Sequence, residues 1–168
     1  MTTDQVHLDL AHFVEHDYPG VVAAVAAITR NAQQAPDAVQ DALVGYLSRP
    51  PAREVQNLAA WITVVASNRT RDHHRRRDTE ARALSRLAPT QPVVTVTDPA
   101  NSLHVDLHDA LARLPLRQRQ VCVLHYLLDQ SVETIAEGLQ VSSGTVKTQL
   151  HRARKSLARM LKEEPADA

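Results

Sequence analysis

The chain has 168 residues, a formal net charge of zero and an aromatic content of only 3%. This length allows one domain or two small ones, and any hydrophobic core must be mainly aliphatic. The single cysteine, Cys122, excludes an internal disulfide and a zinc site built from several cysteines. Because Cys122 lies in the apolar run 121–124, we expect a buried structural thiol.

Charge is segregated along the chain, although the total is zero. Residues 1–60 contain seven acidic and three basic residues, whereas residues 142–162 contain six lysines or arginines and no acidic residue. Such segregation is typical of a protein with two kinds of partner, one a protein and the other a nucleic acid.

The start of the chain carries no targeting signal. Its first nine residues are polar and acidic, and they lack the basic flank and apolar centre of a signal peptide. The longest apolar run, residues 21–28, is too short to cross a bilayer. We therefore expect a soluble, cytoplasmic protein with no membrane segment of its own.

Residues 1–77 carry apolar side chains at helical spacing, which predicts a helical bundle. The first helices end near residues 31–36, where Pro36 fits the first turn of a helix that the proline pair 50–51 terminates. A third helix begins near Asn57 and continues into a stretch, 69–77, with five arginines. The apolar positions are Phe13, Tyr18, Val21, Val22, Val25, Ile28, Val39, Leu43, Tyr46, Leu47, Leu58, Trp61, Ile62 and Val65.

Residues 78–101 change character: they contain Pro89, Pro92 and Pro99 among threonines and valines, without a helical period. We expect a flexible linker here, extended or β-rich. Fully stretched, it would reach at most about 80 Å, which corresponds to roughly two turns of DNA.

Residues 102–168 form a second helical block that contains a helix-turn-helix pattern. Ser131 suits the N-cap of the first helix of this motif, and Glu133 is favourable in its first turn. Gln140 stands in the turn, where many such motifs have Gly, and Ser142 or Ser143 can cap the second helix. The apolar positions are Leu107, Leu111, Leu114, Val121, Leu124, Leu127, Leu128, Ile135, Ala136 and Leu139.

The second helix of the motif has one apolar face and one polar, positive face. A helix of this kind fits the major groove of DNA. The alternative is an ordinary helical hairpin with a solvated face, but solvated faces usually mix charges of both signs. The apolar face consists of Val146, Leu150, Ala153, Leu157 and Met160 or Leu161, and the polar face of Lys147, Thr148, His151, Arg152 and Lys155.

Five segments carry a resemblance. Residues 144–157, GTVKTQLHRARKSL, closely resemble a recognition helix of the pattern GTVKSRLHRARKxL, while 114–121 and 135–136 are similar to LPxxxRxV and IA. In the first block, residues 36–43 resemble AEDLVQETF and 61–72 resemble WLxxIARNxxxDxxR. These patterns are those of the extracytoplasmic-function (ECF) sigma factors, a branch of the sigma-70 family of bacterial transcription initiation factors. The resemblance covers nearly the whole chain.

The resemblance implies an all-α fold of two small helical domains, an N-terminal bundle (1–77) and a C-terminal helix-turn-helix domain (102–168), joined by the linker 78–101. It implies a factor that binds the RNA polymerase core, recognises the minus-ten and minus-thirty-five elements of a promoter and helps to open the DNA. An anti-sigma factor is a further candidate partner.

The same resemblance assigns residues to three surfaces. Contact with the β′ clamp of the polymerase falls to Asp37, Gln40, Asp41 and Leu43. Contact with the minus-ten element falls to Asn68, Arg69, Arg71 and Arg75. Contact with the minus-thirty-five element falls to Thr145, Lys147, Thr148, His151, Arg152 and Lys155.

The residues leave alternatives open at three further places: the loop 51–57, Trp61 and the start of the second block. The loop 51–57 corresponds to the promoter-melting loop of the family, but no aromatic residue lies between Tyr46 and Trp61, so we expect a pocket with polar readout rather than stacking. Trp61 itself lies on an apolar stripe, which favours a core position. The start of the second block would face the β flap of the polymerase, with core packing as the equal alternative, through Leu114, Leu116 and Tyr126.

Catalytic and metal-binding patterns do not emerge from the sequence. His12 and His16 share a helix face, but no carboxylate at ligand spacing completes a site with them or with His7. There is no Gly-rich phosphate loop, nucleophile elbow or paired-carboxylate arrangement. We expect no enzymatic activity, no cofactor and no metal. The alternative function is a self-contained, dimeric helix-turn-helix regulator that needs no polymerase partner.

Overall fold

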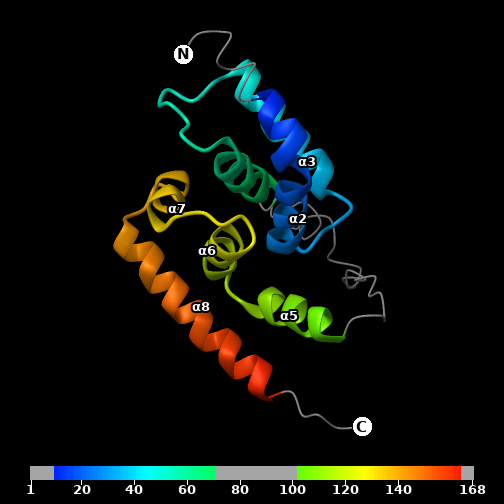
Figure 1. Ribbon diagram of the computed structural model, residues 1–168, viewed down its shortest axis with the longest axis vertical. Helices are drawn as coiled ribbons and strands as arrows, with labels where there is room; N and C mark the ends of the chain where they lie inside the picture. The colour runs from blue at the N-terminus through cyan, green and yellow to red at the C-terminus, as the bar shows by residue number, and fades with distance from the viewer. Residues whose placement is uncertain (1–9, 71–101, 164–168) are drawn as a thin grey trace, which may run out of the picture.

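The computed structural model describes residues 10–70 and 102–163, with the side chains of residues 10–70 and 107–162. Every regular element within these ranges is a helix, as Figure 1 shows. Among them, no helix combines the length and the apolar character that a membrane span needs. The predicted linker and the predicted contacts Arg71 and Arg75 lie outside the described residues.

Three helical segments form the N-terminal half. A π-helical turn, η1 (Phe13–Asp17), leads directly into α2 (Tyr18–Thr29), which ends where Arg30 adopts a left-handed backbone with φ 62°. The next helix, α3 (Ala35–Ser48), has Pro36 in its first turn, as predicted. A third helix begins at residue 58 and reaches the end of the described range at residue 70; we call it the 58–70 helix.

The C-terminal half contains α5 (Ser102–Arg113), α6 (Leu116–Tyr126), α7 (Val132–Leu139) and α8 (Ser143–Glu163). The Oγ of Ser131 accepts a hydrogen bond from the backbone N–H of Thr134 at 3.0 Å, which confirms the predicted N-cap. The Oγ of Ser142 accepts from Thr145 N–H at 3.1 Å, so Ser142 is the serine that caps α8.

The turn between α7 and α8 needs a left-handed residue, and Gln140 supplies it with φ 54°. Glycine is the usual residue at this position because it has no Cβ to clash. The helix-turn-helix therefore closes with its ordinary backbone geometry and an unusual side chain at the turn.

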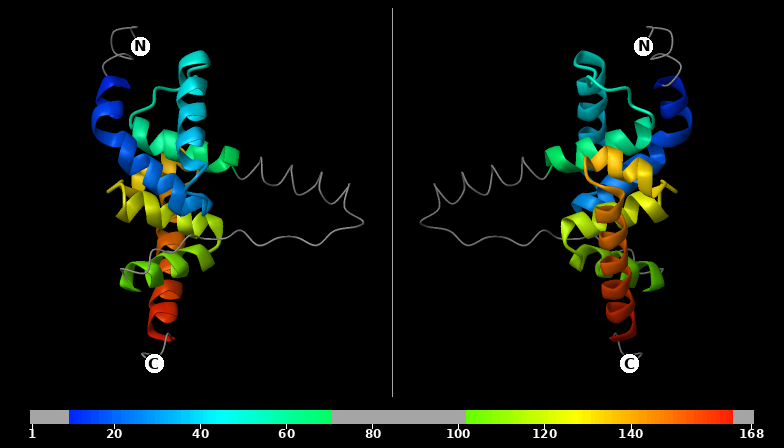
Figure 2. Two further views of the ribbon diagram at one scale, coloured as in Figure 1. Left: turned by 90° about the vertical axis from the view of Figure 1, so that its right-hand side faces the viewer. Right: turned by 90° about the vertical axis from the view of Figure 1, so that its left-hand side faces the viewer.

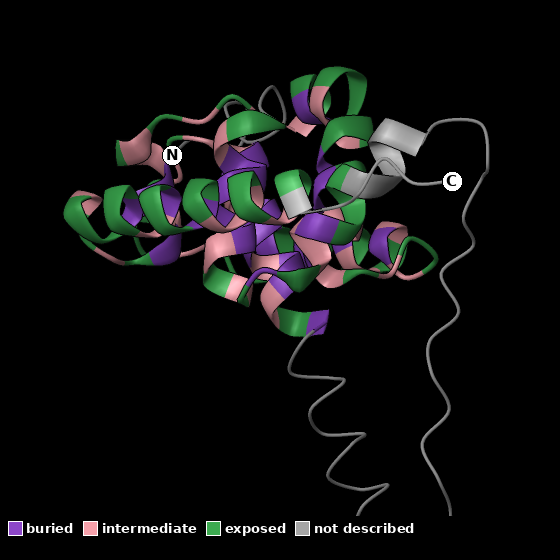
Figure 3. Cartoon of the chain, turned by 90° about the horizontal axis from the view of Figure 1, so that it is seen from below, coloured by how far each residue is buried: buried purple, intermediate pink, exposed green. Residues whose placement is uncertain are grey.

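The core of the C-terminal half is aliphatic, as the composition predicted. The predicted apolar face of α8 is buried, with exposed fractions of 0–2% for Val146, Leu150 and Ala153. These residues share one cluster with α6 and α7, and Cys122 is buried within it. Figure 3 shows the buried positions facing inward and the exposed positions facing outward along each helix.

Two positions at helix ends that were assigned to apolar stripes are exposed instead, and so is Leu107 within α5, at 42%. Leu47 is 49% exposed and Leu127 is 54% exposed. Leu47 lies in the last turn of α3 and Leu127 is the C-cap of α6. At the end of a helix the stripe runs past its packing partners, so periodicity alone assigns these positions wrongly.

The two halves pack against each other. Helix α2 contacts both α5 and α6, and Figures 1 and 2 show α6 between α2 and α8. Ala24 and Ile28 of α2 form a buried cluster with Val123 of α6. Ala60 and Val64 of the 58–70 helix belong to the same buried cluster as α7 and α8. The described residues therefore form one packed unit made of two helical halves.

Candidate nucleic-acid interface

Helix α8 presents one continuous polar face to solvent. All six residues predicted for the minus-thirty-five element are exposed, and all are placed opposite the buried stripe of Val146, Leu150 and Ala153. The salt bridge found among the described residues joins His108 and Asp109, at 3.9 Å, so the cations of α8 form none there. The face consists of Thr145, Lys147, Thr148, His151, Arg152 and Lys155.

Two threonines on this face use their hydroxyl groups inside the helix. Thr148 Oγ1 donates to the carbonyl oxygen of Gly144 at 2.9 Å, and Thr145 Oγ1 shares a hydrogen bond with Ser142 Oγ at 2.9 Å. The methyl group of each threonine is then the part free for an outside contact, and a methyl group matches the C5-methyl of thymine.

One basic residue of α8 differs from the others. The Nε of Arg154 donates to the hydroxyl of Tyr126 at 2.6 Å, and its guanidinium carbon lies 5.9 Å from the centre of that ring. Arg154 therefore ties α8 to α6, an arrangement that the sequence pattern did not reveal. Tyr126 is 60% exposed, whereas Leu114, which was grouped with it, is buried in the core.

Arg119, the arginine of the LPxxxRxV pattern, links two helices of the C-terminal half. Its Nη1 donates to the carbonyl oxygen of Ala112 at 3.0 Å, near the end of α5, and its side chain is buried. Burial lowers the pKa of Arg119, and the positive charge of Arg30 lowers it further. Among the described residues, the Nε of Arg119 has no hydrogen-bond partner. Arg119 thus joins α5 to α6 rather than facing solvent.

The acidic face predicted on α3 is present. Asp37, Gln40 and Asp41 are all exposed and follow one another along the first two turns of the helix. Leu43 is half-buried and packs against the core of the N-terminal half. Val44, which the sequence analysis did not single out, is 61% exposed beside them. Only its exposure in the structure marks Val44 as part of this face, because the spacing of apolar residues in a sequence does not show that one of them is exposed.

The structure does not place Asn68 and Arg69 on one open face. The Oδ1 of half-buried Asn68 accepts a hydrogen bond from Gln120 Nε2, in α6, at 3.0 Å. Arg69 is exposed, and its Nη1 donates to the carbonyl oxygen of Asp41, in α3, at 2.7 Å. In this arrangement Asn68 points toward the C-terminal half and Arg69 toward α3.

The glycine at residue 45 allows two possible roles of Arg69 to be tested separately: holding α3 in place and contacting DNA. A Cβ at residue 45 would lie 2.6 Å from Nη2 of Arg69, so Gly45→Ala must displace the guanidinium while leaving its charge in place. We expect Arg69 mainly to hold α3 against the 58–70 helix through its bond to Asp41. Gly45→Ala and Arg69→Ala should then weaken binding of the polymerase core to the same extent. A core-binding titration of both variants checks it. Weakened minus-ten binding in Arg69→Ala alone would show that the charge acts on DNA.

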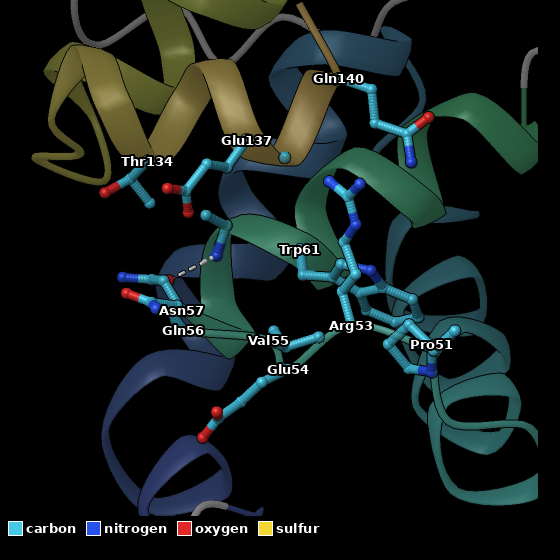
Figure 4. A pocket seen from close by; sticks show the side chains of 13 residues that line it. Pro51, Arg53, Glu54, Val55, Gln56, Asn57, Trp61, Thr134, Glu137 and Gln140 are labelled. Carbon is cyan, nitrogen blue, oxygen red and sulfur yellow. Dashed lines mark hydrogen bonds between the residues drawn. The ribbon is translucent and has the colours of Figure 1, made fainter.

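A hollow of about 560 Å³ lies beside the loop 51–57. Figure 4 shows Arg53, Val55 and Trp61 on one side of it, and Thr134 and Glu137 of α7 with Gln140 of the following turn on the other. The loop is fixed at its end by Asn57, whose Oδ1 accepts from Ala60 N–H at 2.8 Å. The sequence predicted a polar pocket at this loop, but it gave no sign that α7 forms one wall.

Trp61 is half-buried at the edge of the N-terminal core, where its ring lies 5.4 Å from that of Tyr46. It also lines the hollow, so its ring contributes both to the packing of the N-terminal core and to the surface of the hollow. His12 and His16 stack with ring centroids 4.6 Å apart. Within the described ranges, no group of three or more histidine, cysteine or acidic side chains is arranged to hold a metal ion.

Comparison with known families matches both halves. Residues 13–80 match the family model of sigma-70 region 2, and residues 104–157 match that of sigma-70 region 4. The matched ranges contain the α3 face, the loop 51–57, the 58–70 helix and most of α8.

Individual relatives agree with the family models. The RNA polymerase sigma-E factor of Streptomyces coelicolor is 31% identical over 160 residues, which cover 93% of this chain and 86% of the relative. The ECF sigma factor SigW of Bacillus subtilis is 27% identical over 79% of this chain and 78% of its own length.

A solved structure shares the arrangement. The sigma factor RpoE of Bartonella quintana, crystallised with the anti-sigma factor NepR, superposes with a TM-score of 0.74 and 26% identity. The match covers 94% of this chain and 99% of that one. With both regions matched in sequence and the helical arrangement matched in space, the chain belongs to the ECF sigma factors of the sigma-70 family.

Proposed function

We propose that this sigma factor divides its work among three surfaces: α8 reads the minus-thirty-five element, the loop 51–57 with the 58–70 helix engages the minus-ten element, and the acidic face of α3 docks on the polymerase clamp. A sigma factor brings the RNA polymerase core to promoters. The proposal concerns which residues of this chain carry each step.

The exposed face of α8 is the observation that carries the proposal. Its cations have no ionic partner among the described residues, and a row of such cations attracts the phosphates of DNA. Lys147 and Arg152 can pair with guanine edges in the major groove. If about six phosphates are neutralised in all, the logarithm of affinity should fall with the logarithm of salt concentration at a slope of about −5.

The hollow beside the loop 51–57 suits an unstacked base. Opening a duplex requires a place for an extruded base, and such pockets read it through hydrogen bonds and flat side chains. Arg53 and Gln56 supply polar groups at the hollow, and Trp61 supplies a ring. Asn68 and the arginines beyond it would take the backbone of the freed strand.

The acidic face of α3 suits a basic partner helix. Exposed carboxylates of Asp37 and Asp41 can accept charge-assisted hydrogen bonds from arginine. Gln40 adds a donor and an acceptor between them, and exposed Val44 adds an apolar contact.

Reconstituted transcription tests the proposal. Purified chain is combined with RNA polymerase core and a promoter identified by mapping transcript starts after overexpression. The proposal predicts transcription that depends on both the chain and the promoter, and no stable DNA complex that ignores the core. A dimer that shifts a palindromic fragment without core would instead support the self-contained regulator, for which the comparisons offer no support.

The double variant Asp37→Ala with Gln40→Ala is expected to weaken association with the polymerase core. Each substitution removes an exposed polar contact from α3 without touching a buried residue, so the fold should persist. Affinity for core is measured by competition with the wild-type chain. The matched control is Gln33→Ala, an exposed residue just before α3. Unchanged core affinity in the double variant would place the docking surface elsewhere.

Three further points complete the proposal: a candidate partner, the mode of action and the place of action. An anti-sigma factor is a candidate partner, because the Bartonella relative was crystallised with one. The chain acts by binding rather than by catalysis, since the proposed surfaces position DNA and polymerase and supply no reacting group. We place its action in the cytoplasm, where bacterial polymerase and DNA meet.

A further inference from the structure

The packing of α8 against the other helices weakens along its length. Val146, Leu150 and Ala153 have exposed fractions of 0–2%, whereas Met160 is only partly buried and Leu161 is 43% exposed. Figures 1 and 2 show the end of α8 extending beyond α6 and α7. Apolar packing therefore fixes the first half of this helix more firmly than the second half.

One polar contact holds α8 near the place where its full burial ends. Arg154 follows buried Leu150 by four residues and exposed His151 by three, so it lies at the border between the buried stripe and the exposed face. Its Nε donates to the hydroxyl of Tyr126 in α6 at 2.6 Å, and its guanidinium carbon lies 5.9 Å from the centre of that ring. Among the described side chains, no other hydrogen bond links α8 to another helix.

Tyr126 is held in place although it is 60% exposed. The ring of His125 meets it edge to face, with ring centroids 4.8 Å apart. The Nδ1 of His125 lies 2.9 Å from the carbonyl oxygen of Gln130, and because a carbonyl oxygen can only accept, Nδ1 carries the hydrogen of this bond. The N–H of Gln130 donates in turn to the carbonyl oxygen of Leu124 at 3.0 Å. Tyr126 is therefore fixed to the connection between α6 and α7, and Arg154 extends this connection to α8.

The contact uses features of arginine that lysine lacks. A lysine carries the same charge, but it has no Nε–H at this place on its side chain and no flat guanidinium to lie over a ring. A DNA phosphate requires mainly the positive charge, which a lysine also supplies. The exchange of Arg154 for lysine therefore separates a contact with Tyr126 from a contact with phosphate.

Building on the proposed function, we propose that Arg154 and Tyr126 form a strut that sets the tilt of α8 against α6. In this role Arg154 is a positioning residue for the reading of the minus-thirty-five element, and not a phosphate contact. Lys147 and Arg152, which would meet base edges, belong to the same continuous helix. A change of tilt moves both of them relative to the major groove, so the strut acts on the discrimination between promoters.

Holoenzymes assembled with variant chains test this role. Arg154→Lys keeps the charge, and Tyr126→Phe keeps the ring together with any apolar contact that the ring makes to the polymerase. Each is expected to reduce the preference of the holoenzyme for its promoter over one with an altered minus-thirty-five element by about three- to tenfold, the worth of one hydrogen bond. The slope of the logarithm of affinity against the logarithm of salt concentration should not change. The double variant should lose no more than either single variant, because both remove the same contact.

Two other substitutions in α8 are the matched controls. Arg159→Lys makes the same exchange at another exposed position of the helix, and it should keep the preference between the two promoters. Lys155→Ala removes an exposed cation of the reading face, and it should reduce the salt slope by about one. Urea unfolding of each variant measures any change in stability separately.

The possible results lead to different conclusions. If Arg154→Lys and Tyr126→Phe both keep the preference, or if their losses add in the double variant, the strut does not position α8. A lower affinity that is equal for both promoters would overturn the positioning role as well. If Arg154→Ala lowers the salt slope as Lys155→Ala does while Arg154→Lys behaves as the wild type, Arg154 contacts phosphate instead. A wild-type holoenzyme that shows no preference for the intact minus-thirty-five element would overturn the proposed function itself, and the strut with it.

Discussion

Replacing Ile135 with alanine is expected to lower the free energy of unfolding by about 2–5 kcal/mol, because a large side chain is removed from a site that cannot easily collapse. Ile135 is fully buried in α7, within the cluster that joins α6, α7 and α8. The turn that aims α8 depends on this packing. Transcription should therefore fall together with stability.

Urea unfolding measures the effect, and Ile135→Val is the matched control. The valine variant keeps most of the side chain, so its expected loss is about 0.5–1.5 kcal/mol. If alanine costs no more than valine, Ile135 does not hold the helix-turn-helix together.

The double variant Lys147→Ala with Arg152→Ala is expected to produce the largest loss of promoter affinity. Each contact to a base edge is worth about 1–3 kcal/mol, and the two should nearly add if they touch separate base pairs. Both side chains are exposed, so stability should not change. The measurement is the affinity of the assembled holoenzyme for its promoter and for a promoter with an altered minus-thirty-five element.

The control removes the same charge elsewhere on the helix. Arg159→Ala with Lys162→Ala deletes two exposed cations near the end of α8, beyond the turns that contact base edges in recognition helices. This control should weaken all promoters alike and reduce the salt slope. If the control and the double variant lose the same discrimination between promoters, α8 supplies charge but does not read sequence.

Local signals predicted most of the fold. The caps of the helix-turn-helix could be read from Ser131 and Ser142, because a serine hydroxyl before an apolar periodic run satisfies the free N–H groups of a helix start. The exposed face of α8 followed from spacing alone. Pro36 marked the start of α3 for an equally local reason.

What could not be predicted depends on contacts between distant segments. Asn68 looks like a free polar residue in sequence, yet a buried amide 52 residues away occupies its oxygen. Arg69 belongs to a row of arginines, but its reach to Asp41 depends on the glycine at residue 45. Periodicity places a residue on a face of its own helix and says nothing about what covers that face. The boundaries of the two domains near residues 77 and 102 remain a prediction.

Site-directed cleavage of promoter DNA tests the central claim most directly. An iron chelate is attached to Thr148→Cys on α8 or to Ala52→Cys on the loop 51–57, both exposed positions. Cys122 should stay unlabelled, since it is buried and burial raises the pKa of its thiol, although the positive charge of Arg154 partly opposes that shift. In the holoenzyme, the account predicts cuts at the minus-thirty-five element from residue 148 and at the minus-ten element from residue 52. Cuts at one common place from both residues would contradict it.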